Sequence, residues 1–132
     1  MAVYKILFGT YTKRVSKGIY EAELDTEKKL LQNSTFVGGL TNPTYLAISK
    51  ANKVYAVENR DGQGGVVTFD NSVRPLAEIG AQLSEGSAPA YIGVDEDRQL
   101  VYAGYYHRGT VEVYRINDDG NLTLTDTWQN KG

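Results

Sequence analysis

Residues 42–48, Asn-Pro-Thr-Tyr-Leu-Ala-Ile, return 46 residues later as residues 88–94, Ala-Pro-Ala-Tyr-Ile-Gly-Val. Two further pairs of segments match in the same order: residues 53–57 with 100–104, and residues 65–69 with 109–113. Residues 4–9 and 18–22 have the same character and begin the chain with part of a third copy. Three matches in one order, at a nearly constant offset, indicate that the chain is built from a repeated structural unit.

Each complete unit contains four short segments of strand character, joined by turn residues. The predicted strands are residues 43–49, 53–59, 65–70 and 75–83 in one unit, and residues 89–95, 99–106, 109–116 and 122–129 in the next. Residues 111–116 alternate in character, as a strand with two different faces requires. The Asp-Gly pair within Asn117–Gly120 predicts a tight hairpin, because both residues adopt positive φ at little cost. No segment shows the clear period of an amphipathic helix.

Four strands in about 46 residues are typical of one blade of a β-propeller. An immunoglobulin-like sandwich also has many short strands, but it does not predict internal repetition. We therefore expect an all-β chain of about 2.7 four-stranded blades, forming part of a single propeller domain with units at residues 1–40, 41–86 and 87–132. Because propellers close with four to eight blades, this number leaves an open arc with apolar blade faces and strand edges exposed.

The composition argues against several classes of protein. The 132 residues carry a formal net charge of −2, with charges spread along the chain, which disfavours nucleic-acid binding. The absence of cysteine removes disulfides, thiolate catalysis and Cys-based zinc sites, and with one histidine we expect neither a metal site nor a cofactor. No apolar run is long enough to span a membrane, and residues 1–5 do not begin a signal peptide. The expected location is the cytoplasm.

A functional site on a propeller is expected where the second and third strands of each blade are connected, beside the crossings between blades. That face would display residues 10–14, 58–61 and 105–108, with the crossings 41–44 and 87–91 between them. The opposite face would carry residues 49–53, residues 95–98 and the Asp-rich hairpins, which look like ordinary solvated turns.

Several of these segments also carry a family resemblance. They are Leu7–Thr12 followed by Gly18–Tyr20, then Asn42–Ala47, Ala88–Tyr91 and Val101–Val113. In combination they resemble the lactonase family of seven-bladed β-propellers, typified by 6-phosphogluconolactonase, over essentially all 132 residues. In that family Asn often stands where this chain has Gly104.

The resemblance implies a hydrolase of a sugar-phosphate lactone in the pentose phosphate pathway, with a parent chain of roughly 320 residues at the period seen here. Relatives continue into a His-rich stretch and further blades, which supply His, Arg and Glu residues implicated in the site. This chain would be the N-terminal fragment of such a parent. We expect it to hold one wall of the pocket and to be inactive by itself.

Lactone hydrolysis requires stabilisation of an oxyanion, activation of water and, for this substrate class, binding of a phosphate. His107 is the candidate catalytic residue, because histidine can act as a general base near neutral pH. The candidate substrate-binding residues are Tyr11, Arg14, Glu58, Arg60, Tyr106 and Arg108. Arginine suits phosphate or carboxylate because it donates two parallel hydrogen bonds. Each of these side chains could instead be an ordinary loop residue, and Tyr45 and Tyr91, which recur at an offset of 46, are expected to pack between blades.

Two alternatives stay open. The propeller could be a non-catalytic binding or scaffold module, because one fold hosts many functions. This alternative gains if His107 and the loop arginines point away from a common concavity. Copies of the chain could also associate through their exposed blade faces, or by exchanging strands.

Overall fold

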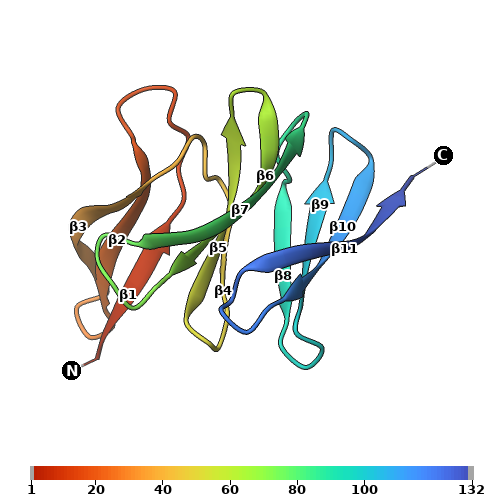
Figure 1. Ribbon diagram of the computed structural model, residues 1–132. Helices are drawn as coiled ribbons and strands as arrows, with labels where there is room; N and C mark the ends of the chain where they lie inside the picture. Colours follow the sequence, from red (N-terminus) through yellow and green to blue (C-terminus); the bar gives the residue numbers. More distant parts are fainter. Residues whose placement is uncertain (1, 131–132) are drawn as a thin grey trace.

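The computed structural model describes residues 2–130, which form 11 strands in three antiparallel sheets (Figure 1). Blade 1 contains β1 (Val3–Phe8), β2 (Gly18–Asp25) and β3 (Leu30–Gly39). Blade 2 contains β4 (Leu46–Ile48), β5 (Lys53–Arg60), β6 (Gln63–Asp70) and β7 (Ala77–Glu85). Blade 3 contains β8 (Tyr91–Asp95), β9 (Leu100–Tyr105), β10 (Thr110–Ile116) and β11 (Leu122–Gln129). The all-β prediction is confirmed, and the strands of each sheet fall within one predicted unit. Residues 1, 131 and 132 of the first and last units lie outside the described residues.

Each blade is a meander in which consecutive strands pair with each other. The three blades stand side by side in chain order (Figure 1). At one edge of the stack β4 lies beside β8, and at the other edge β7 lies beside β11. This is the arrangement of consecutive propeller blades, as the repeat predicts.

Residues with positive φ close several of the hairpins. Asp61 and Gly62 join β5 to β6 with φ values of 53° and 78°, as a two-residue hairpin turn with positive φ at both central positions requires. Asn52 and Gln99 have φ values of 63° and 55° and occupy equivalent places in blades 2 and 3, before β5 and β9. The repeat therefore extends to the backbone conformation of its turns.

Two apolar layers hold the blades together. The layer between blades 1 and 2 contains Ile19, Val37, Leu40, Val54, Ala56, Val67, Phe69 and Leu76. The layer between blades 2 and 3 contains Tyr55, Val57, Val66, Ile92, Val101, Ala103, Tyr105, Tyr114 and Leu122. Because successive side chains of β5 enter opposite layers, the strand is buried on both faces, which explains its unbroken apolar run.

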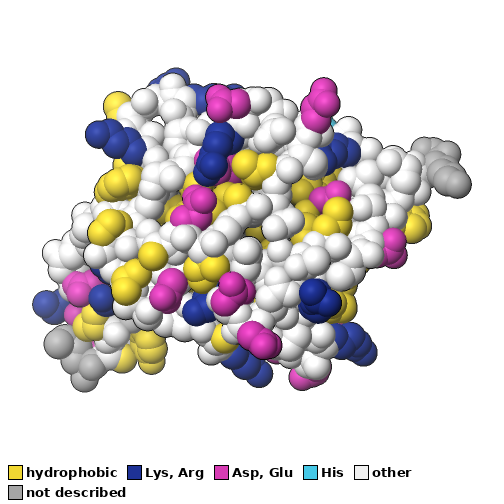
Figure 2. Space-filling view, viewed as in Figure 1, with side chains coloured by type: hydrophobic (Ala, Val, Ile, Leu, Met, Phe, Trp, Pro, Cys, Tyr) yellow, Lys and Arg dark blue, Asp and Glu magenta, His cyan; other side chains and the backbone are white. Residues whose placement is uncertain are grey.

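Charged side chains of both signs are interspersed over the visible face rather than gathered by sign (Figure 2). Apolar side chains show between them along the middle of the stack (Figure 2). In the part of the chain that the structure describes, no helix is long and apolar enough to cross a membrane.

Candidate functional site

The connections predicted to share a face do lie at one end of the stack. The β1–β2, β5–β6 and β9–β10 connections meet the β3–β4 and β7–β8 crossings at the upper end in Figure 1. We call this the loop end. All the residues predicted from the sequence as catalytic or substrate-binding lie at this end.

Glu58 and Arg60, at the end of β5, form a close ion pair. The Glu58 side chain is 3% exposed, and its Oε2 accepts a hydrogen bond from Arg60 Nη2 at 2.6 Å. Its Oε1 accepts a hydrogen bond from the backbone N–H of Thr41 at 3.1 Å, which fixes the crossing between blades 1 and 2. The hydrogen bond that Arg60 donates to Glu58 raises the pKa of Arg60, whose guanidinium also lies 3.5 Å from Glu78. Both carboxylate oxygens of Glu58 therefore have partners within the protein.

The β1–β2 connection is anchored by a pair of polar residues and presents two others to solvent. Asn42 Oδ1 accepts hydrogen bonds from the backbone N–H of Thr12 at 2.7 Å and from its hydroxyl at 3.1 Å. Asn42 has a φ of 51°, a conformation that asparagine tolerates better than most residues. Beyond this anchor, Arg14 is exposed and Tyr11 is 68% exposed, with Lys13 Nζ 5.8 Å from the centre of its ring. Tyr11 and Arg14 are thus open to solvent at the loop end.

The β9–β10 turn separates Tyr106 and His107 from Arg108. The rings of Tyr106 and His107 are exposed and pack edge to face, with their centroids 5.2 Å apart. Arg108 instead turns toward blade 2, where it donates hydrogen bonds to Ser84 Oγ at 2.8 Å, Ser84 O at 3.0 Å and Gly64 O at 3.2 Å. Its guanidinium also lies 4.3 Å from the centre of the Tyr105 ring. Arg108 therefore joins blades 2 and 3.

The nominated residues form three separate groups along the loop end rather than one cluster. Within residues 2–130, no hydrogen bond, ion pair or ring contact joins these three groups, which are Tyr11 with Arg14, Glu58 with Arg60, and Tyr106 with His107. Between them Tyr45 and Tyr91 pack with ring centroids 5.3 Å apart, so these tyrosines make the contact between blades that their repeat spacing predicts. The described residues bring no three His, Cys, Asp or Glu side chains together in a metal-binding cluster.

The sequence did not identify a chain of buried hydroxyl groups beneath the β9–β10 turn. Tyr105 and Tyr114 lie with their hydroxyl oxygens 3.1 Å apart, and the Tyr114 hydroxyl donates to Glu112 Oε1 at 2.5 Å. Burial raises the pKa of Tyr105 to about 12, and it also raises the pKa of Tyr114. These hydrogen bonds hold Tyr105, on whose ring Arg108 lies, in place. They therefore support the β9–β10 turn that carries His107.

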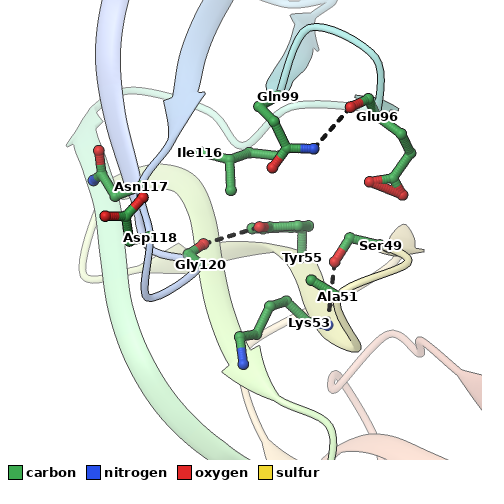
Figure 3. Close-up of a pocket in the computed structure, with 10 residues that line it drawn as sticks. All are labelled: Ser49, Ala51, Lys53, Tyr55, Glu96, Gln99, Ile116, Asn117, Asp118 and Gly120. Atoms are coloured by element: carbon green, nitrogen blue, oxygen red, sulfur yellow. Dashed lines mark hydrogen bonds between the residues drawn. The ribbon is translucent and has the colours of Figure 1, made fainter.

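At the opposite end a cavity of about 450 Å³ opens between blades 2 and 3 (Figure 3). Within it the Tyr55 hydroxyl donates to Gly120 O at 2.9 Å, and Gln99 Nε2 donates to Glu96 O at 2.8 Å. Ser49 Oγ accepts a hydrogen bond from the backbone N–H of Lys53 at 3.2 Å. These hydrogen bonds hold the β4–β5, β8–β9 and β10–β11 turns in place.

Tyr55 gives a test of this packing. Burial raises its pKa to about 12, so the folded state binds the phenolic proton more tightly than the unfolded state, where the pKa is about 10. The resulting stability is fully present below pH 10 and is lost as the pH rises toward 12, at up to about 1.4 kcal/mol per pH unit. Urea unfolding of a Tyr55→Phe variant should show lower stability at pH 7, by about 1 kcal/mol, and a shallower loss between pH 10 and 12.

The exposed Tyr11→Phe variant is the matched control and should follow the parent chain at every pH. Parallel pH profiles for the Tyr55→Phe variant and the parent chain would contradict the buried position of this phenol.

Comparisons with known proteins bear on the whole chain. The family model described as lactonase, 7-bladed beta-propeller, matches residues 5–132. A Bacillus subtilis protein named 6-phosphogluconolactonase is 42% identical over 125 residues, which are 92% of this chain and 36% of the relative. The crystal structure of a Lactobacillus plantarum protein matches with a TM-score of 0.94 and 45% identity, over 98% of this chain and 38% of that one.

A further crystal structure, of a putative 6-phosphogluconolactonase from Bacteroides uniformis, matches with a TM-score of 0.82 and 28% identity, over 95% of this chain and 37% of that one. The chain thus spans little more than a third of the length of the relatives that it matches. With a family model that covers nearly every residue and blades that superpose on those of solved relatives, the chain belongs to the lactonase family of seven-bladed β-propellers.

Proposed function

We propose that the chain is the N-terminal portion of a cytoplasmic hydrolase that converts 6-phosphogluconolactone to 6-phosphogluconate in the pentose phosphate pathway. The observation that carries the proposal is the 42% identity, over 92% of the chain, with the Bacillus subtilis protein named 6-phosphogluconolactonase. The loop end is the proposed substrate face, because it gathers polar and cationic side chains from all three blades.

In the proposed reaction a water oxygen attacks the lactone carbonyl carbon, and the bond from that carbon to the ring oxygen breaks. The water gives up a proton, the ring oxygen gains one, and the product is the open-chain acid. His107 is the proposed acceptor of the water proton, because its ring is exposed on a turn that Arg108 anchors to blade 2. No described side chain donates to the oxyanion in this proposal, so that role belongs to residues outside the chain.

Phosphate binding is proposed for Arg14 and Arg60. Arg14 is exposed on the β1–β2 connection, and the Arg60 side chain is 42% exposed beside Glu58. Glu58 holds Arg60 in place and leaves part of the Arg60 guanidinium open to solvent. A guanidinium held in this way is oriented before an anion binds. The hydroxyl groups of Tyr11 and Tyr106 are proposed to contact the sugar.

A non-catalytic binding module is the second candidate function. The observation that favours it is that Arg108 and Arg60 donate to groups of the protein itself, whereas a phosphate clamp needs donors directed into a common space. On this reading the loop end is a binding surface, and its exposed tyrosines would contact a partner.

The proposed function predicts a preference for the phosphorylated lactone. The longer protein that continues this chain should hydrolyse 6-phosphogluconolactone with a kcat/KM at least about tenfold above that for gluconolactone, since one charged hydrogen bond contributes about 1.5–3 kcal/mol. An Arg14→Ala variant should have a smaller preference, because only Arg60 then remains to bind the phosphate, and it should retain turnover of the unphosphorylated lactone.

Arg98→Ala, at the opposite end of blade 3, is the matched control and should behave as the parent. Equal rates with both lactones would contradict phosphate recognition, and absence of turnover with either would favour the binding module.

A further inference from the structure

Two residues of the β3–β4 crossing, Thr41 and Asn42, connect the two parts of the loop end that carry the proposed phosphate-binding arginines. On one side, Asn42 Oδ1 accepts hydrogen bonds from the N–H and the hydroxyl of Thr12, and the Asn42 N–H donates to Thr12 Oγ1 at 3.1 Å. On the other side, the Thr41 N–H donates to Glu58 Oε1 at 3.1 Å, and Thr41 O accepts from the Asn59 N–H at 3.2 Å. The crossing therefore joins the β1–β2 connection to the end of β5.

Within the β1–β2 connection, Arg14 lies between two anchored residues. Thr12, two residues before it, is bonded to the crossing. Ser16, two residues after it, shares a hydrogen bond between its hydroxyl and that of Thr10, and Thr10 Oγ1 donates to Gly18 O at 2.5 Å. Only three residues separate the two anchors, so the backbone position of Arg14 depends on the position of Thr12.

Arg60 depends on the same crossing through Glu58. Glu58 Oε2 accepts from Arg60 Nη2 at 2.6 Å, while its Oε1 accepts from the crossing. The carboxylate cannot turn without losing one of these hydrogen bonds, and at 3% exposure of the side chain water does not replace the lost partner. The positions of Arg14 and Arg60 are therefore both referred to one short stretch of backbone.

Asn42 departs from the repeat at this point. The equivalent residue of the next unit is Ala88, whose side chain has no hydrogen-bond acceptor. A crossing between blades is thus formed without asparagine, and the side chain of Asn42 serves the contact with Thr12 alone. Its φ of 51° turns the backbone in a way that asparagine and glycine adopt more readily than other residues.

We propose that Asn42 is a positioning residue for phosphate recognition, because its bonds to Thr12 set the separation between Arg14 and Arg60. This inference rests on the proposed function, in which both arginines bind the phosphate of the lactone. Two guanidinium groups bind one phosphate well only when both are placed and oriented toward it. Loss of the Asn42 side chain keeps both arginines but lets their separation vary, so phosphate affinity falls while the chemistry at the lactone carbonyl is unaffected.

The test is a titration of the isotope-labelled 132-residue chain with inorganic phosphate, followed by nuclear magnetic resonance of the amides of residues 10–17 and 58–62. In the parent chain both segments should shift with one Kd. Asn42→Gly removes the side chain and keeps a residue that adopts positive φ. It should raise the Kd at least about threefold and give the two segments different Kd values, because the arginines are no longer held together.

Asn52→Gly is the matched control, since Asn52 also has positive φ, at 63°, but lies in the β4–β5 turn at the opposite end. This variant should bind phosphate as the parent chain does. The amide spectrum of each variant also establishes that it is folded.

Substitutions of Thr12 separate positioning from stability. Valine has the shape of threonine but no hydroxyl, so Thr12→Val should weaken phosphate binding, whereas Thr12→Ser keeps the hydroxyl and should restore the parent Kd. In an Arg14→Ala background, Asn42→Gly should have little further effect, because the guanidinium that it places is absent. In the longer protein, Asn42→Gly should raise the KM for 6-phosphogluconolactone and leave kcat unchanged.

A parent Kd for Asn42→Gly, or equal losses for Asn42→Gly and Asn52→Gly, would overturn the positioning role. A parent chain that binds no phosphate would also overturn it, because no anion site would exist for Asn42 to position. Failure of the proposed function gives a different result. The longer protein would then leave the lactone hydrolysing at the buffer rate, while phosphate binding by the chain still depended on Asn42.

Discussion

Replacing Gly65 by alanine is expected to lower the free energy of unfolding by at least about 4 kcal/mol, in the range that only severe core or backbone disruption reaches. A Cβ atom at Gly65 would lie 1.8 Å from the carbonyl oxygen of Gln82 and 2.9 Å from the Cα of Leu83. These are backbone atoms of β7, so no side-chain rotation relieves the overlap. The strand has to move, and with it the pairing of β6 with β7.

The measurement for Gly65→Ala is urea unfolding followed by far-ultraviolet circular dichroism. Gly104→Ala is the matched control, because a Cβ there would be 3.8 Å from the Cβ of Tyr91, an ordinary contact. That variant should be neutral or up to about 1 kcal/mol more stable, since alanine restricts the unfolded chain more than glycine does. An unfolding midpoint for Gly65→Ala equal to that of the parent chain would contradict the close approach of β6 and β7.

Replacing Arg108 by alanine is expected to destabilise the chain by about 2–4 kcal/mol. The change removes the three hydrogen bonds that the guanidinium donates to Ser84 and Gly64, together with its contact on the Tyr105 ring. It also uncovers the ring of Tyr105, whose hydroxyl lies 3.1 Å from that of Tyr114. Arg108→Lys should recover part of the loss, because an ammonium group keeps the charge but not the forked hydrogen bonds.

Urea unfolding also measures the effect of Arg108→Ala, with Arg98→Ala as its matched control. Arg98 forms an ion pair with Asp95, but its side chain is 73% exposed, so its loss should change stability by less than about 1 kcal/mol. Equal stability of the two variants would show that Arg108 does not join the blades, and would return it to the set of residues available for phosphate.

The strands could be predicted from the sequence because each one repeats a local pattern. The sequence pattern predicts the first strand of blade 2 at residues 43–49, but β4 covers only Leu46–Ile48. Pro43 has no N–H to donate to a ladder, and the Thr44 N–H is already bonded to Asn42 O. The residues before β4 thus belong to the crossing, and a pattern of residue types does not show where a ladder begins.

The two faces of β10 show a different limit. The alternation of the sequence assigned its side chains to two faces, but it did not show that Glu112 lies on the covered face and Val111 on the exposed one. Glu112 is buried toward blade 2, where the Tyr114 hydroxyl donates to it, and Val111 is 37% exposed on the other face of the strand. Burial in this case depends on the neighbouring blade, which the residues of one strand do not specify.

The gathering of the connections was predictable from the sequence, and their side-chain contacts were less so. The loop end follows from the order of strands in each unit, and the structure brings the predicted connections together there. The direction of Arg108 depends on the carbonyl groups of Gly64 and Ser84, which lie 44 and 24 residues away along the chain. Asn42 and Thr12 were not identified as anchors, although Asn42 departs from the repeat, where Ala88 occupies its position. Such departures from an internal repeat are a signal that sequence analysis can use.

The rate of 6-phosphogluconolactone hydrolysis, followed by the formation of 6-phosphogluconate, tests the account most directly when this chain and the longer protein are compared. Under the proposed function, the purified 132 residues should leave the lactone hydrolysing at the buffer rate, because the proposal assigns them only one wall of the site. The longer protein should exceed the buffer rate at least tenfold. Hydrolysis by the chain alone would place a complete site within these three blades, and a longer protein no faster than buffer would contradict the lactonase function.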